Sequence, residues 1–324
     1  MKAIVYHSYG SPDVLKCEEI EKPTPGDDEV LIKVRAASLN PLDWRIMRGV
    51  PPILRILFRM PNPSVERPGR AGRDVAGQVE AVGSKVTQFK PGDDVFGACL
   101  AACAEYACAS ESKLAMKPAN VTFEQAASVP VAALTALQGL RDLGRLQPGQ
   151  TVLINGAAGG VGTFAVQIAK FFGAEVTGVC STRNVDLVRS LGANRVIDYT
   201  QEDFTKSGQR YDLILECVGN HSLSECRRVL NPKGICVIAG APKQIGIFLV
   251  RALAAPVLSW FVSQKLIMFM AKITKADLAT MGELIATGKV TPVIDRRYKL
   301  NEVPDAIRYL EEGHARGKVV ITFE

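Results

Sequence analysis

The sequence predicts an α/β protein with two structural parts, a small irregular β-barrel and a parallel, doubly wound sheet. Short strand signals separated by proline and glycine occupy the first 120 residues, as in small barrels. From about Asn120, strand patterns alternate with helical patterns at the spacing of a parallel sheet. A glycine-rich run at 156–162 lies between a strand and a helix. These three observations together place the chain in the α/β class.

The composition is that of an ordinary globular protein long enough for two domains. Its 324 residues are 47% hydrophobic and 22% charged, with a formal net charge of +6. That charge suits a small anionic ligand. It is too diffuse to indicate a nucleic-acid surface, and the sequence contains no nucleic-acid-binding motif.

The cysteines and the first residues indicate a reducing compartment. A strand begins at once with Lys2–Tyr6, and no secretory or transit segment precedes it, so we expect a cytoplasmic protein. The eight cysteines are then expected to be free thiols, most of them core residues in apolar runs.

Three segments carry the strand pattern of the first part. Residues Glu29–Ala36 alternate over much of their length, Asp74–Gly83 form a second strand, and the turn Pro91–Gly97 leads into a third. After Lys289 the chain returns to short strands and contains one helix, Val303–Glu312.

The segment Trp44–Arg73 is both basic and apolar. It contains seven arginines opposed only by Glu66, with the apolar stretch Ile53–Phe58 in its middle. Such a segment can contact an anionic membrane surface. The interpretation that we favour is a long loop beside a substrate cleft, with its arginines in water and its apolar residues at the mouth of the cleft.

The second part alternates strands with helices, which predicts a doubly wound parallel sheet. The predicted strands are Thr151–Asn155, Glu175–Cys180, Arg195–Asp198, Tyr211–Leu215 and Gly234–Ile238. The predicted helices are Phe123–Gly144 with a break at Pro130, Thr163–Lys170, Asn184–Leu191 and His221–Leu230.

Two apolar segments follow the fifth strand. Gly246–Gln264 is 19 residues long, but Arg251 and Pro256 interrupt it, so we expect a packed helix rather than a membrane span. Lys265–Met270 is expected to be a further strand at the sheet edge, which favours a homodimer.

The strongest functional signal is the glycine-rich run Gly156-Ala157-Ala158-Gly159-Gly160-Val161-Gly162. Between a buried strand and a helix, such a turn binds a pyrophosphate at the helix N-terminus. Gly159 lets the backbone approach the anion and Gly162 lets the helix pack closely, because neither has a Cβ. Ala157 occupies the first glycine position of the dinucleotide fingerprint, so a turn without a ligand would also explain the run by itself.

The residues after the second strand indicate which dinucleotide is bound. An acid there accepts a hydrogen bond from a ribose 2′-hydroxyl and repels a 2′-phosphate. This chain instead has Ser181, Thr182 and Arg183, two hydroxyl donors and a guanidinium that can pair with phosphate. The sequence therefore favours NADP, with an ordinary helix cap at Ser181 or Thr182 as the alternative.

Six motifs are distributed along the whole chain. They are Leu39–Trp44, Gly72–Gly77, Lys90–Asp93, Leu134–Ala136, the glycine-rich run and Gly313–Lys318. Together they resemble the medium-chain dehydrogenase/reductase superfamily, and within it the zinc-independent quinone oxidoreductases. The first and last are most similar to the chloroplast-envelope quinone oxidoreductase homologues and the mitochondrial reticulon-4-interacting proteins. This resemblance implies a Rossmann domain at 122–270, inserted into a GroES-like β-barrel formed by 1–121 and 271–324.

The resemblance also implies which residues bind the cofactor. The expected pyrophosphate contacts are Ala158, Gly159, Gly160 and Val161, and those of the 2′-phosphoadenosine are Ser181, Arg183 and Tyr199. The residues expected to line the remaining groove are Val218, Gly240, Phe269, His314, Ala315 and Arg316. Asn40 and Thr135 are expected near the nicotinamide.

The sequence argues against a bound metal. Zinc-dependent members of the superfamily carry a His-Glu pair where this chain has Arg73-Asp74, and an arginine cannot deprotonate to become a ligand. The structural zinc lobe needs four closely spaced cysteines, whereas Cys99, Cys103 and Cys108 supply three.

Without a metal to polarise a carbonyl, the acceptor must already be electron-poor. The leading hypothesis is an NADPH-dependent reductase of quinones or α,β-unsaturated carbonyl compounds that relies on positioning. Asn40 is the candidate carbonyl partner and Asp43 the candidate proton relay, unless they only cap a helix and form a turn. Arg45 replaces a tyrosine of some relatives. An NADPH-binding regulatory or membrane-surface protein with little turnover is the second hypothesis, and a zinc alcohol dehydrogenase the third.

Overall fold

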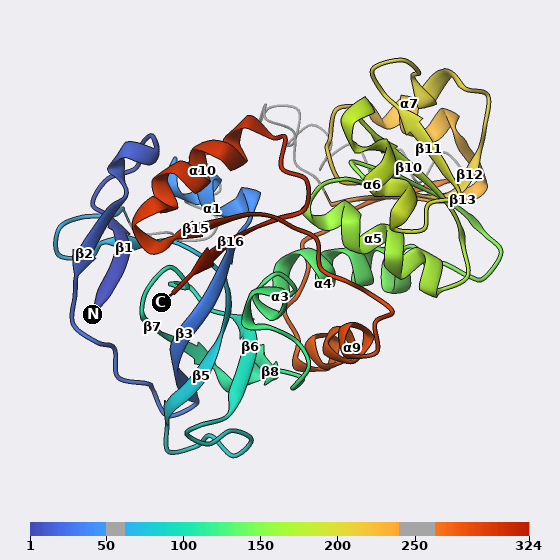
Figure 1. The fold of residues 1–324 in the computed structure, drawn as a ribbon. Coiled ribbons are helices and arrows are strands. Elements are labelled where there is room, and N and C mark those ends of the chain that lie inside the picture. Colours follow the sequence, from blue (N-terminus) through green and yellow to red (C-terminus); the bar gives the residue numbers. More distant parts are fainter. Residues whose placement is uncertain (50–61, 240–262, 324) are drawn as a thin grey trace. The chain divides into compact units, whose positions relative to one another are not determined.

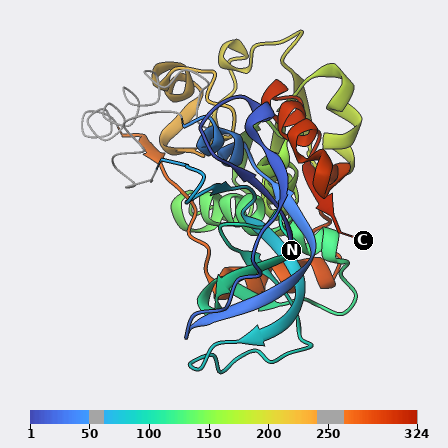
Figure 2. The same ribbon diagram turned by 90° about the vertical axis from the view of Figure 1, so that its left-hand side faces the viewer.

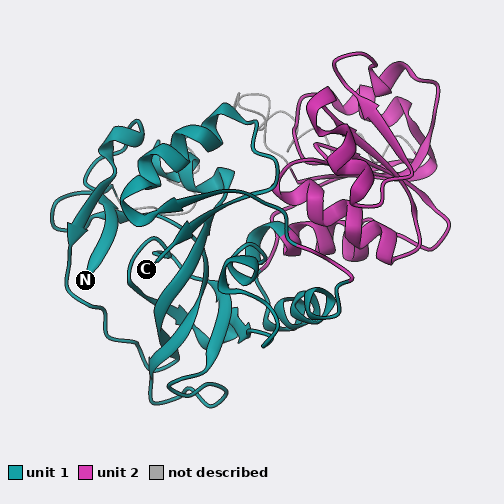
Figure 3. Ribbon diagram, viewed as in Figure 1, with its two compact units in different colours: residues 1–132, 273–288, 292–324 teal, residues 133–272, 289–291 magenta. Residues whose placement is uncertain are grey.

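The structure is a computed structural model that describes residues 1–49, 62–239 and 263–323. It contains two compact units (Figure 3). Unit 1 comprises Met1–Ala132, Ile273–Gly288 and Pro292–Glu324, and unit 2 comprises Ala133–Lys272 and Lys289–Thr291. Residues 122–132, expected at the start of the Rossmann domain, lie in unit 1. Their helix α3 (Phe123–Ala127) is tied to a barrel strand by the Ser38 hydroxyl, which donates to the Ala127 carbonyl at 2.8 Å.

Unit 1 is built on a seven-stranded sheet in the order β15-β16-β3-β5-β6-β8, with β7 paired to β3 (Figure 1). Its strands are β3 (Glu29–Leu39), β5 (Asp74–Val82), β6 (Asp94–Ala98), β7 (Tyr106–Ser110), β8 (Leu114–Met116), β15 (Ile294–Lys299) and β16 (Lys318–Thr322). A smaller sheet contains β1 (Lys2–Tyr6), β2 (Lys16–Glu19) and β4 (Gly69–Arg70).

The late strand β16 closes the barrel against the early strand β3. The two are antiparallel, with Val319 opposite Leu39 and Thr322 opposite Ala36, and both views show them together (Figures 1 and 2). Such pairing completes the GroES-like barrel that the sequence predicted. The helices of unit 1, besides α3, are α1 (Pro41–Met47), α9 (Lys275–Ala286) and α10 (Val303–Glu312), with single 3₁₀ turns at Pro12–Val14, Glu111–Lys113 and Leu300–Glu302.

Unit 2 contains a six-stranded parallel sheet in the order β11-β10-β9-β12-β13-β14. The strands are β9 (Thr151–Asn155), β10 (Glu175–Cys180), β11 (Arg195–Asp198), β12 (Tyr211–Glu216), β13 (Leu230–Ile238) and β14 (Lys265–Met268). This is the doubly wound Rossmann order, in which the strand order reverses between β9 and β12. Dinucleotides bind at such a reversal, outside the carboxyl ends of the strands.

One helix, which begins in unit 1, precedes the first strand of this sheet, and the others lie between its strands. The helices are α4 (Pro130–Gln138) with a π-helical extension at Gly139–Leu143, α5 (Gly160–Phe171), α6 (Val185–Ser190) and α7 (Leu223–Arg228), with 3₁₀ turns at Thr182–Asn184 and Phe204–Lys206. The helix predicted up to Leu230 ends two residues earlier, because Leu230 already pairs with Tyr211 as the first residue of β13. The break predicted at Pro130 is present, since α3 ends before it and α4 begins at it.

The apolar stretches give a mixed outcome. Lys265–Met268 is confirmed as the edge strand β14. Within the described ranges, no helix is both long and apolar enough to cross a membrane. Most of Gly246–Gln264, the middle of the basic segment Trp44–Arg73 and the predicted contact Gly240 lie outside the described residues.

Candidate active site

The glycine turn, defined as residues 156–162, is held tightly between β9 and β10. Gly156 has a φ of +83°, which suits glycine, and it begins the turn. The N–H groups of Gly156 and Ala157 both donate to the Val179 carbonyl, at 3.2 and 3.0 Å. Gly156 therefore supplies the sharp turn that the fingerprint assigns to its first glycine, one position before Ala157.

The turn fits a pyrophosphate at the start of α5. The first α-helical bond of α5 runs from Thr163 N to Gly159 O at 2.9 Å, so the N–H groups of 160–162 precede the helical ladder. A Cβ on Gly159 would meet only the Gly156 oxygen, at 3.4 Å, which leaves room beside the backbone. A Cβ on Gly162 would lie 2.1 Å from the same oxygen, so the helix packs on the turn only with glycine there. Ala158, in the same turn, is buried, with 5% of the residue exposed.

A buried carboxylate, absent from the sequence prediction, organises the opposite side of the strand reversal. Glu216 ends β12, and its Oε1 accepts from the N–H groups of Val218 and Gly219, both at 2.8 Å. Asn155, at the end of β9, donates to both Glu216 oxygens at 3.0 and 2.8 Å and to Asn220 at 2.9 Å. The loop that carries Val218 is thereby fixed to the strand that precedes the glycine turn.

The expected 2′-phosphate residues lie at the end of β10, next to an acid on the neighbouring strand. Parallel pairing places Asp198 beside Cys180, and Thr182 donates to Asp198 at 2.6 Å. That bond and those from Thr200 hold the pKa of Asp198 below its usual range. The Thr182 hydroxyl is therefore a donor to Asp198, not the phosphate donor that the sequence suggested.

Ser181 and Tyr199 border the same strand ends. The Ser181 hydroxyl accepts from Asn184 Nδ2 at 3.2 Å, which leaves its own hydrogen for another acceptor. Tyr199 follows β11 and is 55% exposed. Arg183 lies between them in sequence, within the 3₁₀ turn after β10.

The remaining predicted cofactor residues are divided between the two units. Thr135 on α4, Val218 and Phe269 belong to unit 2, and Phe269 directly follows β14. His314, Ala315 and Arg316 form the connection from α10 to β16 in unit 1, where Arg316 N donates to Asp295 at 2.8 Å.

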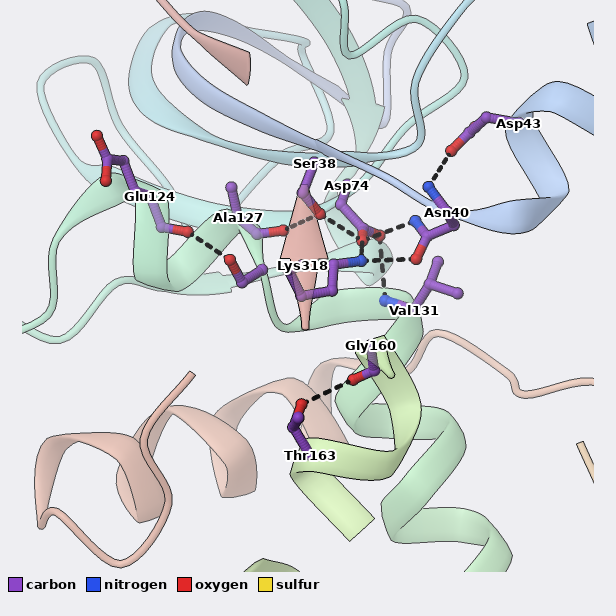
Figure 4. Close-up of polar contacts among 11 residues, drawn as sticks. Ser38, Asn40, Asp43, Asp74, Glu124, Ala127, Val131, Gly160, Thr163 and Lys318 are labelled. Atoms are coloured by element: carbon purple, nitrogen blue, oxygen red, sulfur yellow. Dashed lines mark hydrogen bonds and ion pairs between the residues drawn. The ribbon is translucent and has the colours of Figure 1, made fainter. Parts of the chain in front are cut away.

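The second group of candidate residues is a buried polar cluster at one edge of the barrel sheet (Figure 4). This rim cluster contains Ser38, Asn40, Asp74 and Lys318. They come from the end of β3, the residue after it and the starts of β5 and β16, which the antiparallel pairing brings together. Lys318 Nζ lies 2.6 Å from Asn40 Oδ1 and 3.1 Å from Asp74 Oδ2. Asp74 also accepts from Asn40 Nδ2 at 2.9 Å and Val131 N at 3.1 Å, and Ser38 Oγ lies 3.0 Å from its Oδ2.

Asp43 is attached to this cluster through the backbone of Asn40. Asn40 is the N-cap of α1, and its N–H donates to Asp43 Oδ2 at 2.6 Å. Burial raises the pKa of Asp43 to about 7, and this hydrogen bond and the charge of Arg73 only partly oppose the rise. Asn40 and Asp43 therefore do cap a helix, as the alternative stated, and they are also the neighbours of a buried ion pair.

These residues do not fit a zinc ion. The Asp74 carboxylate already accepts from Asn40, Val131 and Lys318, and the Lys318 ammonium would repel a cation. Burial raises the pKa of Cys99 to about 12, which opposes the thiolate that zinc requires. Over residues 1–49, 62–239 and 263–323, no group of three or more His, Cys, Asp or Glu side chains is arranged to hold a metal.

Comparison with known proteins places this architecture in a family. Residues 26–139 match the alcohol dehydrogenase GroES-like domain and residues 191–321 match the zinc-binding dehydrogenase family. The chloroplast envelope quinone oxidoreductase homolog of Arabidopsis thaliana is 35% identical over 338 residues, which cover 99% of this chain and 98% of that protein. The chain belongs to the medium-chain dehydrogenase/reductase superfamily, in its quinone oxidoreductase-like branch.

Further relatives of this branch also match nearly the whole of this chain. The NADPH-dependent alkenal/one oxidoreductase of Arabidopsis thaliana is 36% identical and covers 99% of this chain, which spans 79% of that protein. The mitochondrial NAD(P)H oxidoreductase RTN4IP1 of Mus musculus is also 36% identical, with 99% and 89% covered.

Solved structures of the branch superpose over the full chain. The quinone oxidoreductase of Coxiella burnetii has a TM-score of 0.86 and 31% identity, with 100% and 99% of the two chains covered. The Escherichia coli quinone oxidoreductase complexed with NADPH has a TM-score of 0.82 and 26% identity, with both chains fully covered.

Proposed function

We propose that this protein is an NADPH-dependent oxidoreductase that transfers a hydride to a quinone or an α,β-unsaturated carbonyl compound without a metal ion. The observation that carries the proposal is the glycine turn. It presents the N–H groups of Gly160 and Val161 ahead of the α5 ladder, beside a Gly159 with open space at its Cβ position. A helix start of this kind at the strand reversal binds a dinucleotide pyrophosphate.

NADPH is proposed over NADH because of the residues after β10. No acid follows Cys180 directly, and the Ser181 hydroxyl and the Arg183 guanidinium suit a 2′-phosphate. Asp198 lies close by, but its four donors already occupy the carboxylate. A relative named as NADPH-dependent and a similar structure solved with NADPH support the same choice.

The acceptor class follows from the occupied Asp74 and from the relatives. A site without zinc cannot polarise an unactivated ketone strongly, so an electron-poor acceptor is required. When bound, reduced nicotinamide supplies a hydride. The acceptor gains that hydride and one proton, so a quinone becomes a hydroquinone and an enone becomes the saturated ketone. The names of the relatives include quinone and alkenal/one oxidoreductases.

The chain's own residues then have distinct proposed roles. Asn40 donates to the oxygen of the acceptor, and Thr135 lies at the nicotinamide end. Asp43, with its pKa of about 7, holds a proton close to Asn40 at neutral pH. Within unit 2, Val218 and Phe269 are proposed to contact the rest of the cofactor.

The test is a steady-state assay of NADPH and NADH oxidation with benzoquinones, naphthoquinones, 2-alkenals and 2-alkenones, repeated after dialysis against a chelator. We expect turnover with at least one acceptor class, a lower KM for NADPH than for NADH and no effect of the chelator. Tight NADPH binding in calorimetry without turnover on any acceptor would instead support a regulatory protein. Loss of activity on chelation would contradict the metal-free proposal.

We also propose a homodimer that pairs through β14. This strand is the last in the sheet order of unit 2, next to β13, and a strand in that position can pair with a second copy. Sedimentation equilibrium should give twice the 35.0 kDa chain mass. A monomer at micromolar concentration would contradict this assembly.

A further inference from the structure

Lys318 is an unusual residue for a sheet interior. Its side chain is 2% exposed, and the strand residues after it, Val319, Val320 and Ile321, are core residues. An ammonium in such a place needs acceptors, and Lys318 contacts Asn40 Oδ1 and Asp74 Oδ2. A buried ion pair seldom stabilises a fold more than apolar residues of the same size would. Lys318 is therefore a candidate for a role other than stability.

The chemistry of its neighbours fixes the amide of Asn40 in one orientation. An ammonium only donates and an ionised carboxylate only accepts. Asn40 must therefore turn its oxygen to Lys318 and its nitrogen to Asp74, as the 2.6 and 2.9 Å distances show (Figure 4). The opposite orientation would place a donor against a donor and an acceptor against an acceptor.

Both charged residues, Lys318 and Asp74, have hydrogen-bond partners. What the cluster can still offer a ligand is a hydrogen-bond donor. One Nδ2 hydrogen of Asn40 is used by Asp74, which leaves the second. Asp74 Oδ2 already accepts from Asn40 and Lys318, and its Oδ1 accepts from Val131 N. A ligand at Asn40 therefore has to bring an acceptor, such as a carbonyl or quinone oxygen.

We propose that Lys318 is a positioning residue for hydride transfer, because it fixes the Asn40 amide as a donor to the oxygen of the acceptor. This inference rests on the proposed function. The hydrogen bond from Asn40 strengthens as negative charge develops on that oxygen, so the contact favours the transition state over the bound acceptor. Lys318 acts through Asn40 and contacts no reacting atom itself.

The test compares three variants with the wild type: Lys318→Met, Lys318→Arg and the control Lys117→Met. Lys117 is also a buried lysine of unit 1, with 6% of its side chain exposed, and it pairs with Asp94 and two backbone carbonyls away from the rim cluster. We expect kcat of Lys318→Met to fall at least about tenfold, as for loss of an oxyanion donor, with Kd for NADPH unchanged. Lys318→Arg, which also only donates, should recover most of the loss, and Lys117→Met should keep the wild-type kcat.

A second measurement does not depend on turnover. The Asn40 side-chain amide signals are assigned in a ¹⁵N–¹H spectrum by their absence from Asn40→Ala. Both Asn40 amide signals should move upfield in Lys318→Met, because the ammonium no longer polarises the amide through its oxygen, and should keep their wild-type positions in Lys117→Met. An unchanged Asn40 signal in Lys318→Met, or a kcat loss equal to the loss of folded protein, would overturn the role of Lys318. Absence of wild-type turnover with the amide shift behaving as expected would refute the proposed function and leave the orientation of Asn40 supported.

Discussion

The glycine turn of unit 2 and the rim cluster of unit 1 make polar groups available in opposite ways. The turn uses backbone N–H groups from one continuous run of residues, in which every side chain except that of Val161 is hydrogen or methyl. The rim cluster uses charged side chains, and Lys318 and Asn40 are 278 positions apart. A site built from backbone depends on close packing, whereas a site built from charges depends on which partners are present. Each prediction below changes one of these properties.

The largest effect is expected from Gly162→Ala. The new Cβ would lie 2.1 Å from the Gly156 oxygen and 2.7 Å from Ala157, and neither backbone atom can move without opening the turn. We expect a loss of more than about 3 kcal/mol in the free energy of unfolding, measured in urea, with NADPH binding abolished. Gly159→Ala is the matched control, since its Cβ meets only one atom at 3.4 Å. An equal loss of unfolding free energy in Gly162→Ala and Gly159→Ala would show that close packing at residue 162 is not what destabilises the protein.

The second effect comes from Asp43→Asn and depends on pH. The pKa of Asp43 is about 7 in the folded protein and near 3.8 in the unfolded chain. Between pH 3.8 and 7 the carboxyl is therefore protonated in the folded state and ionised in the unfolded state. Wild-type stability contributed by Asp43 is therefore complete below about pH 4 and is lost as the pH rises through 7.

The neutral amide of Asp43→Asn cannot titrate. We expect the unfolding free energy of the variant, relative to wild type, to rise from pH 4 to 7 by a few kcal/mol and then to level off. Urea titrations at several pH values measure it. If the difference in unfolding free energy between variant and wild type stays constant from pH 4 to 7, the Asp43 carboxyl is ionised throughout this range.

A smaller effect is expected from Glu216→Gln in unit 2. One oxygen can still accept from Val218 and Gly219, but the new NH₂ faces the Nδ2 donor of Asn155. We expect a loss of about 1–3 kcal/mol in stability and weaker NADPH binding. Glu225→Gln, which keeps an acceptor for the exposed Ser222 N–H, should change little. Calorimetry measures Kd for NADPH in both variants. Equal Kd values would show that Glu216 does not contribute to cofactor binding.

The smallest effect, and the most selective, is expected from Arg183→Glu. A carboxylate would repel a 2′-phosphate but not a 2′-hydroxyl, so KM for NADPH should rise roughly tenfold more than KM for NADH, about 1.4 kcal/mol. Arg189→Glu is the control, because Arg189 lies on α6 and pairs with Asp186. Equal changes in both KM values would refute the 2′-phosphate assignment.

The sequence predicted the local features of this fold well. The strands Thr151–Asn155, Glu175–Cys180 and Arg195–Asp198 and the helix Val303–Glu312 have the predicted bounds. Their apolar runs are short and are bounded by turn residues. The parallel sheet, its edge strand and the barrel are also confirmed. They could be predicted because the alternation of strands and helices is visible in the sequence without knowledge of tertiary contacts.

The sequence could not reveal which polar side chains meet. Asp198 reaches Thr182 only because β11 pairs in parallel with β10, and Glu216 reaches Asn155 only because β12 lies beside β9. Lys318 carried one signal, a lysine at the start of an otherwise apolar strand, but its partners depend on the pairing of β16 with β3. The roles assigned to the cofactor and catalytic residues stay predictions.

The position of β16 has a consequence for how the protein is made. Unit 2 ends at Thr291, so the ribosome has synthesised all of it before β16 exists. Until residues 318–322 emerge, β3 lacks one neighbour and Asp74 lacks its countercharge. The strands of the unit 2 sheet have therefore all been made while β3 still lacks β16, and only the last stretch of translation completes the rim cluster.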